Sequence, residues 1–207
     1  MTVSEAQTRA IATLAPLLDE GTYLAGGVAI GLALGHRTSL DVDFFVPHDF
    51  DAERLAEHIL TSLPPESHAR ETGRARGTLH LEVENIPVSI LSYRYPMLSA
   101  PSQSESLPVR VASLEDLLCM KLLAIAGRGA AKDFWDLDAL LSHGVASGNL
   151  NTALERFAVK YPRVDTGHLV RSLAYFGDAD AAALPRGLGR TQWEALKKRI
   201  QTRVQAL

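Results

Sequence analysis

Two aspartates separated by one residue, Asp41 and Asp43, have the types and spacing that point most clearly to chemistry. They lie in the run Asp41-Val-Asp-Phe-Phe-Val46, which is typical of a strand and is followed by a proline. Because side chains alternate along a strand, both carboxylates project to one side. Carboxylates are depleted in strands and costly to bury without a cation. The pair therefore predicts a Mg²⁺ site; the alternative is an exposed strand edge with hydrated acids.

A glycine pair, Gly26-Gly27, precedes Asp41 between a short strand expected at 23–25 and a helix expected at 28–34. Glycine lets a backbone come close to a phosphate, and the first N–H groups of a helix point toward an anion there. In the loop that follows, Arg37 suits phosphate binding, and Ser39 suits binding phosphate or orienting Asp41. The alternative is an ordinary turn followed by a polar loop.

Lys121 is the first of only five lysines, and it interrupts an apolar stripe on a helix expected from Ser113 to about Ala126. Its aliphatic stem could run to the surface. If the ammonium instead faces a cleft, it supplies counter-charge for a triphosphate or for charge that develops in phosphoryl transfer.

A basic glycine loop, Gly127-Arg128-Gly129, precedes another expected helix, 132–142, which places Asp133 and Asp136 on one side. These aspartates can hold Lys121 or Arg128 in place. The alternative is that they are acidic residues near a helix N-terminus and nothing more.

The remaining pattern indicates which elements position these residues. A capping box at Ser4 and Gln7 begins an amphipathic helix over 4–19. The other expected elements are a helix at 51–62, strands at 78–84 and 88–93 around a turn at 85–87, an irregular connection at 95–108, and weaker helices at 150–160, 166–176 and 190–205. We therefore expect an α/β core over 1–110 followed by an all-helical region over 111–207.

Composition excludes several classes of protein. The chain has 207 residues, a net charge of −3 and one cysteine, so it is no disulfide scaffold, and Cys119 is expected to act as a small buried hydrophobe. No apolar run approaches the roughly 18 residues of a membrane span, and the N-terminus lacks the order of a signal peptide. A cytoplasmic protein without a membrane partner is expected.

The charge is unevenly distributed along the chain. Residues 1–107 carry a net −7 and residues 108–207 a net +4. The excess of cations gathers near the C-terminus, at Arg186, Arg190, Lys197, Lys198, Arg199 and Arg203. This basic stripe could hold a polyanion, and a solvated helix face is an equal alternative.

Several of these motifs occur together, in order, in a known family. The segments Leu24-Ala-Gly-Gly-Val-Ala-Ile30, His36-Arg-Thr-Ser-Leu-Asp-Val-Asp-Phe-Phe45 and 121–137 (KLLAIAGRGAAKDFWDL) resemble the AbiEii/AbiGii-type nucleotidyltransferase toxins, including MenT-like proteins, of the DNA polymerase beta-like superfamily. Arg76-Gly-Thr-Leu79 and Tyr93-Arg-Tyr-Pro-Met-Leu98 match as well. The resemblance runs over about residues 20–142.

The resemblance implies a mixed sheet that carries the aspartate pair, and Mg²⁺-dependent transfer of a nucleoside monophosphate from an NTP with loss of pyrophosphate. It also implies a toxin with an antitoxin partner, and an acceptor such as the 3′ end of tRNA. By position, Asp41 and Asp43 would be the metal ligands, and Lys121 and Asp133 would join them as catalytic residues, with Asp133 orienting the lysine. The glycines 26 and 27, Arg37, Ser39, Lys121 and Arg128 would bind the nucleotide.

Two positions depart from the superfamily pattern. A third carboxylate is expected on a later strand, but the aligned residue is Ser89, and Glu82 or Glu84 would have to reach the site instead. The usual Gly-Ser is Gly27-Val28, which removes one hydroxyl contact to phosphate.

Three functions are compatible with this sequence. The first is a toxin-type nucleotidyltransferase acting on RNA. The second is nucleotidylation of a small molecule, such as an aminoglycoside, or of a protein, which the acidic N-terminal half favours. The third is a non-catalytic protein that binds nucleotide or an antitoxin, which Ser89 favours.

Overall fold

The computed structural model describes residues 3–207, and the chain divides into two compact units. The sheet unit comprises the chain up to Pro96 together with Ala100–Ser113. The helical unit comprises Leu114–Leu207 and the short segment Met97–Ser99. Each unit is described by itself.

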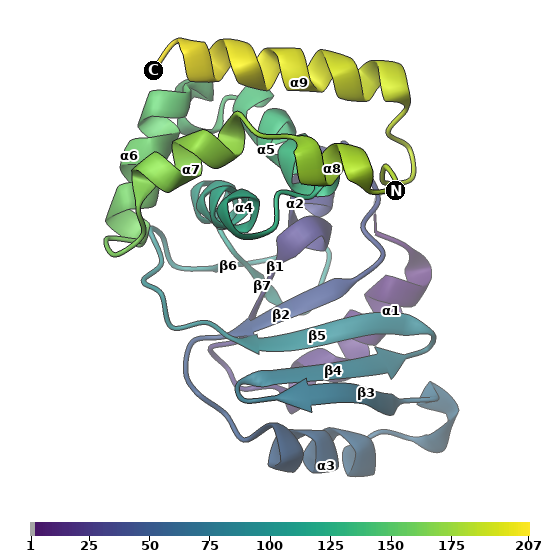
Figure 1. The fold of residues 1–207 in the computed structure, drawn as a ribbon. Helices are drawn as coiled ribbons and strands as arrows, with labels where there is room; N and C mark the ends of the chain where they lie inside the picture. The colour runs from purple at the N-terminus through teal and green to yellow at the C-terminus, as the bar shows by residue number, and fades with distance from the viewer. Residues whose placement is uncertain (1–2) are drawn as a thin grey trace. The chain divides into compact units, whose positions relative to one another are not determined.

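The sheet unit contains a mixed seven-stranded sheet in the order β3-β4-β5-β2-β1-β7-β6 (Figure 1). The strands are β1 Tyr23–Ala25, β2 Val42–Val46, β3 Arg70–Ala75, β4 Thr78–Val83, β5 Ile86–Ser92, β6 Ser102–Gln103 and β7 Arg110–Val111. Strand β2 runs antiparallel to β1 and parallel to β5, and β4 is antiparallel to both β3 and β5. This sheet and the helices after it confirm the α/β architecture predicted from the sequence.

Helices α1 (Glu5–Leu14) and α3 (Ala52–Ser62) supply apolar residues to the core of the sheet unit. Ile11 and Ile59 pack in one cluster with the inward-facing residues of β2, β4 and β5, among them Val42 and Phe44. Helix α2 (Gly26–Leu34) follows β1 directly, and 3-10 turns lie at Ala15–Leu17 and Pro65–Ser67. One face of the sheet is thus covered by hydrophobic contacts, and the alternate positions of β2 point to the other face.

The predicted turn at 85–87 was wrong, and strands β3, β6 and β7 were not predicted, β6 lying in the connection expected to be irregular. The turn between β4 and β5 is formed by Glu84 and Asn85, both with positive φ, and the strand already begins at Ile86. Pro87 is tolerated there because β2 pairs with β5 only from Val88 onward, so no partner needs the missing N–H on that side. Strand β3 was not predicted, because an exposed edge strand shows no apolar alternation.

The helical unit is built around α4 (Leu114–Gly127), which packs against α5 (Ala131–Ser142), α6 (Leu150–Lys160) and α7 (Thr166–Leu173). Helix α9 (Arg190–Gln205), yellow in Figure 1, packs against α5 and α7. A 3-10 turn at Val145–Gly148 and the five-residue α8 (Gly177–Ala181) complete the unit.

Aromatic side chains connect the later helices of this unit. Phe134, Phe176 and Trp193 contact one another, with ring centroids 4.9 to 6.0 Å apart. Along residues 3–207, no helix is both long and apolar enough to cross a membrane.

Candidate active site

Asp43 lies in β2 opposite Ala25, the last residue of β1. It is half-buried, whereas its neighbours Val42 and Phe44 are fully buried in the core on the opposite face. Gly26 follows Ala25 with φ +69°, and a Cβ at that position would overlap the Asp43 carboxylate. The carboxylate therefore lies directly against the first residue of α2. Asp41, also half-buried, is the residue just before the strand.

Gly27 forms a second close approach at the start of α2. A Cβ there would lie 2.5 Å from Ser39 Oγ and 2.7 Å from Arg37 Nη2. Both side chains are buried, with Arg37 only 9% exposed. A guanidinium and a hydroxyl thus converge on a glycine backbone at a helix N-terminus, which is the donor set that a phosphate group requires.

Gln7 holds this loop in place, a role that the sequence did not reveal. Its Nε2 donates to Ser39 O at 2.7 Å and to Leu40 O at 3.3 Å, and the side chain is 2% exposed. The same residue closes the capping box of α1 with Ser4. From the sequence Gln7 is only a helix cap, because the carbonyls that it binds lie more than 30 residues away.

Asp43 is the first of three polar residues that lie opposite one another on neighbouring strands. Asp43 pairs with Ser89 on β5, and Ser89 pairs with His80 on β4, so the three side chains share one face. His80 Nδ1 lies 3.1 Å from Ser89 Oγ. Ser89, where the resemblance implies a third carboxylate, thus lies beside Asp43, and His80, which sequence reasoning missed, is its other neighbour. Apolar and polar residues alternate within Thr78–Val83, and this alternation is the sequence signal that places His80 on the polar face.

The two glutamates considered as a substitute for that third acid have other partners. Glu82 pairs with Arg70 at 2.9 Å, and Glu84 pairs with Arg9 at 2.7 Å. Within the described part of the chain, no three His, Cys, Asp or Glu side chains are grouped so as to hold a metal ion. Two carboxylates still fit Mg²⁺, because this ion commonly takes one or two from the protein and completes its shell with substrate phosphates and water.

The helical unit holds a second group of predicted site residues. Lys121 is buried, and its Nζ lies 3.1 Å from Asp133 Oδ1 and 2.7 Å from Asp136 Oδ2. Arg128 makes a two-pronged contact with Asp133, through Nε at 2.8 Å and Nη2 at 2.9 Å. Both aspartates are fully buried, so Lys121 does not run to the surface but is fixed between two carboxylates.

The charges in this group alter the acidity of Asp133. Burial raises the pKa of its carboxyl, but the hydrogen bond from Arg128 and the charges of Lys121 and Arg128 outweigh burial and hold the pKa below its ordinary value. Asp133 is thus held as an anion. The predicted site residues fall into two groups, with Gly26, Gly27, Arg37, Ser39, Asp41 and Asp43 in the sheet unit and Lys121, Arg128, Asp133 and Asp136 in the helical unit.

The basic stripe near the C-terminus is partly neutralised by its own unit. Lys197 pairs with Asp180 and Glu194, both at 3.0 Å, and Arg199 pairs with Asp138 at 2.6 Å. Arg203 donates to the carbonyl of Gly148. The opposing carboxylates at 138 and 180 come from other helices, so the stripe alone did not show them.

Solved structures share this fold. The nucleotidyltransferase toxin MenT4 of Mycobacterium tuberculosis matches with a TM-score of 0.67 at 15% identity, over 98% of this chain and 82% of that one. JHP933 of Helicobacter pylori matches with a TM-score of 0.51 at 20% identity, over 96% and 92%. ANT(2″)-Ia, in complex with adenylyl-2″-tobramycin, matches with a TM-score of 0.50 at 15% identity, over 76% and 98%. The fold is that of nucleotidyltransferases.

The family follows from the sequence match. The model of the nucleotidyl transferase AbiEii toxins, of type IV toxin–antitoxin systems, matches residues 9–206. An uncharacterised protein of Aquifex aeolicus (strain VF5) is 37% identical over 160 residues, which are 76% of this chain and 74% of that protein. The chain belongs to the AbiEii nucleotidyltransferase toxin family, as its motifs predicted.

Proposed function

We propose that this protein is a Mg²⁺-dependent toxin that transfers a nucleoside monophosphate from an NTP to the 3′ end of an RNA, and that an antitoxin restrains it. The observation that carries the proposal is the Asp43 carboxylate lying against Gly26, beside the Arg37 and Ser39 side chains that converge on Gly27. Nucleotidyl transfer needs a carboxylate that can hold a metal ion next to hydrogen-bond donors that can bind a phosphate.

Each residue of the sheet unit has a role in this proposal. The backbone at Gly26 and Gly27, with Arg37 and Ser39, binds the phosphates of the NTP. Asp41 and Asp43 hold Mg²⁺, which when bound supplies positive charge to the triphosphate. Gln7 keeps the loop at Ser39 in the binding conformation.

The transfer step moves one proton, and in this proposal His80 accepts it. The acceptor 3′-oxygen attacks the α-phosphorus, the bond from that phosphorus to the bridging oxygen breaks, and pyrophosphate leaves. With Nδ1–H donating to Ser89 Oγ, His80 has its Nε2 lone pair free to take the hydroxyl proton. His80 thus replaces the carboxylate that Ser89 lacks.

Lys121 and Arg128 provide positive charge for the triphosphate in this scheme. Asp133 and Asp136 hold the Lys121 ammonium in position, and Asp133 does the same for the Arg128 guanidinium. This role follows from the family resemblance together with the ion pairs inside the helical unit.

A small-molecule acceptor is the second candidate. The fold is shared with ANT(2″)-Ia, solved with adenylyl-2″-tobramycin, and residues 1–107 are acidic enough to favour a cationic acceptor. A non-catalytic binding protein is the third, and it is supported by Ser89, which pairs with Asp43 where the family resemblance implies a third acid.

The deciding experiment follows α-phosphate label from each NTP, with Mg²⁺, into total RNA, an aminoglycoside panel and the protein itself. Asp43→Asn is the matched control, because it keeps the side-chain shape and removes the charge. Label in RNA from the unmutated protein alone is expected. Label in aminoglycoside or in protein would replace RNA as the acceptor, and no transfer despite measurable NTP binding would favour the non-catalytic function.

A further inference from the structure

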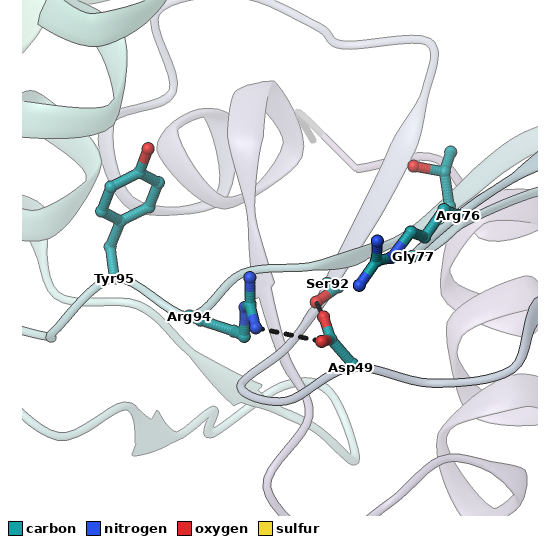
Figure 2. A pocket seen from close by; sticks show the side chains of 7 residues that line it. Asp49, Arg76, Gly77, Ser92, Arg94 and Tyr95 are labelled. Carbon is teal, nitrogen blue, oxygen red and sulfur yellow. Dashed lines mark hydrogen bonds and ion pairs between the residues drawn. The ribbon is translucent and has the colours of Figure 1, made fainter.

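The sheet unit contains a surface basin of about 660 Å³ that the proposed chemistry does not use. Three separate segments line it, namely the chain after β2, the turn between β3 and β4, and the end of β5 (Figure 2). Its main lining residues are Asp49, Arg76, Gly77, Ser92, Arg94 and Tyr95. Two motifs shared with the family, at 76–79 and 93–98, thus meet at one place in the fold.

The basin has an excess of positive charge. Arg94 Nη1 lies 3.0 Å from Asp49 Oδ2, and Ser92 Oγ donates to Asp49 Oδ1 at 3.1 Å, so the single carboxylate already has partners. Arg76, on the other side of Asp49 and Ser92 in Figure 2, makes no hydrogen bond or ion pair with any residue from 3 to 207. A planar guanidinium without a carboxylate partner is suited to bind a phosphate with two hydrogen bonds.

The basin also carries an aromatic surface. The Tyr95 ring stands beyond Arg94 in Figure 2 and is 48% exposed. It rests on Tyr93, with centroids 5.2 Å apart, and Tyr93 rests on Phe45 at 5.3 Å. Proteins that bind single-stranded nucleic acid combine exposed aromatic rings with nearby cations. Bases stack on the rings, and the cations bind the phosphates.

The basin lies on the same pair of strands as the proposed active site. Phe45 lies two residues after Asp43 on the same face of β2, and it contacts Tyr93, which contacts Tyr95. The strands end at the pair Val46 and Ser92, three residues beyond the pair Asp43 and Ser89. At a rise of about 3.3 Å per residue this separation along the strand is about 10 Å, which is within reach of an RNA strand whose 3′ end lies at Asp43.

We propose that this basin binds the acceptor RNA a few nucleotides before its 3′ end, with Arg76 and Arg94 on phosphates and Tyr95 stacked on a base. The inference rests on the proposed function for its orientation of the strand. The positive charge that steers RNA to the site then comes from the sheet unit, despite the net negative charge of that part of the chain.

The test measures binding of a fluorescein-labelled single-stranded RNA by anisotropy across a series of salt concentrations. Arg76→Ala and Arg94→Ala are each expected to weaken binding and to reduce the slope of log affinity against log salt by about 0.7, the value for one lost phosphate contact. Tyr95→Ala is expected to weaken binding with the slope unchanged, and Tyr95→Phe to bind as the unmutated protein does. Arg54→Ala, at an exposed arginine on α3, is the matched control and leaves both quantities unchanged.

Two outcomes overturn the inference. One is RNA binding with unchanged affinity and slope in the basin variants, which would leave the basin as a docking surface for a protein. The other is an unmutated protein that binds no RNA. NTP binding by Arg76→Ala, measured in parallel, is expected to be unchanged. If the RNA slope falls as expected but no RNA accepts a nucleotide, the basin inference stands and the proposed transferase function fails.

Discussion

The carboxylate of Asp43 occupies the space that a side chain at Gly26 would need. The backbone of Gly26 is also in the left-handed region, at φ +69°. Both facts make glycine necessary at this position, and they tie the glycine motif to the aspartate motif. The proposed phosphate site and the proposed metal site are therefore in direct contact.

Gly26→Ala is expected to displace Asp43 and to lower the rate of nucleotide transfer by about 100-fold, the cost of moving a reacting group by about 1 Å. Single-turnover transfer measures it. Gly35→Ala is the matched control, because Gly35 has nearly the same φ, +66°, but open space around its Cβ position. Equal losses in both variants would mean that backbone strain, and not displacement of the carboxylate, is the cause.

His80→Ala is expected to lower transfer by about 100-fold or more, which is the usual contribution of a positioned proton acceptor. Adding Ser89→Asp to this variant should restore much of the activity, because it supplies a carboxylate beside Asp43 that can accept the proton in place of His80. The exposed His58 on α3 offers a neutral control, His58→Ala. The role of His80 is contradicted if its alanine variant transfers normally, or if the aspartate restores nothing.

Asp133→Asn is expected to destabilise the helical unit by about 3 to 5 kcal/mol near neutral pH, because it leaves Lys121 and Arg128 with a neutral amide in place of a carboxylate. The folded-state pKa of Asp133 lies below its ordinary value of 3.8, so its charge stabilises the fold above that value. This contribution is lost as the pH falls through the folded-state pKa.

The difference in unfolding free energy between unmutated protein and Asp133→Asn should therefore be constant above about pH 5 and shrink below about pH 4. Chemical denaturation at a series of pH values measures it. A difference that stays the same down to the acid limit of the folded protein would show that Asp133 is not held as an anion by its neighbours.

Asp116 and Lys160 form another buried pair in the helical unit. Both are fully buried, with Lys160 Nζ 2.7 Å from Asp116 Oδ1, and Asp116 also accepts the N–H groups of Leu98 and Ser99. Asp116→Ala is expected to cost about 3 to 5 kcal/mol, because it leaves a buried ammonium unpaired. Asp116→Asn combined with Lys160→Met should cost less than half as much in urea unfolding. If the double variant loses as much unfolding free energy as Asp116→Ala, the unpaired ammonium is not the cause of the loss.

Cys119 should be chemically silent in the folded protein. Burial raises the pKa of its thiol to about 12, and the residue is inaccessible. A disulfide reagent at about pH 8 should therefore label no thiol in the native chain and one after denaturation, since only the thiolate reacts. Rapid labelling of the native chain would contradict the packing described for α4.

The sequence predicted the parts of the fold that depend on local pattern. The β1 strand, α2 and its end at Gly35, β2 and every helix of the second half except α8 were expected within a few residues, because each has an apolar period or a cap of its own. The edge strand β3, the two-residue strands β6 and β7 and the short α8 were missed, because none of them shows a period. The expected helix over 4–19 ends as an α-helix at Leu14, before Pro16.

The candidate site was predictable where its residues are adjacent in sequence and hidden where they are brought together by pairing. The aspartate pair and the glycine pair could be read directly. Gln7 and His80 could not, because their partners, Ser39 and Ser89, are set by a loop contact and by strand register. The partners of the C-terminal cations were hidden for the same reason.

The most direct test of the central claim is the mass of a purified short RNA after incubation with NTP and Mg²⁺. The proposal predicts an RNA longer by at least one nucleotide with the unmutated protein, and an unchanged RNA with Asp43→Asn. An unchanged RNA with both proteins, although the unmutated one binds NTP, would contradict transfer to RNA.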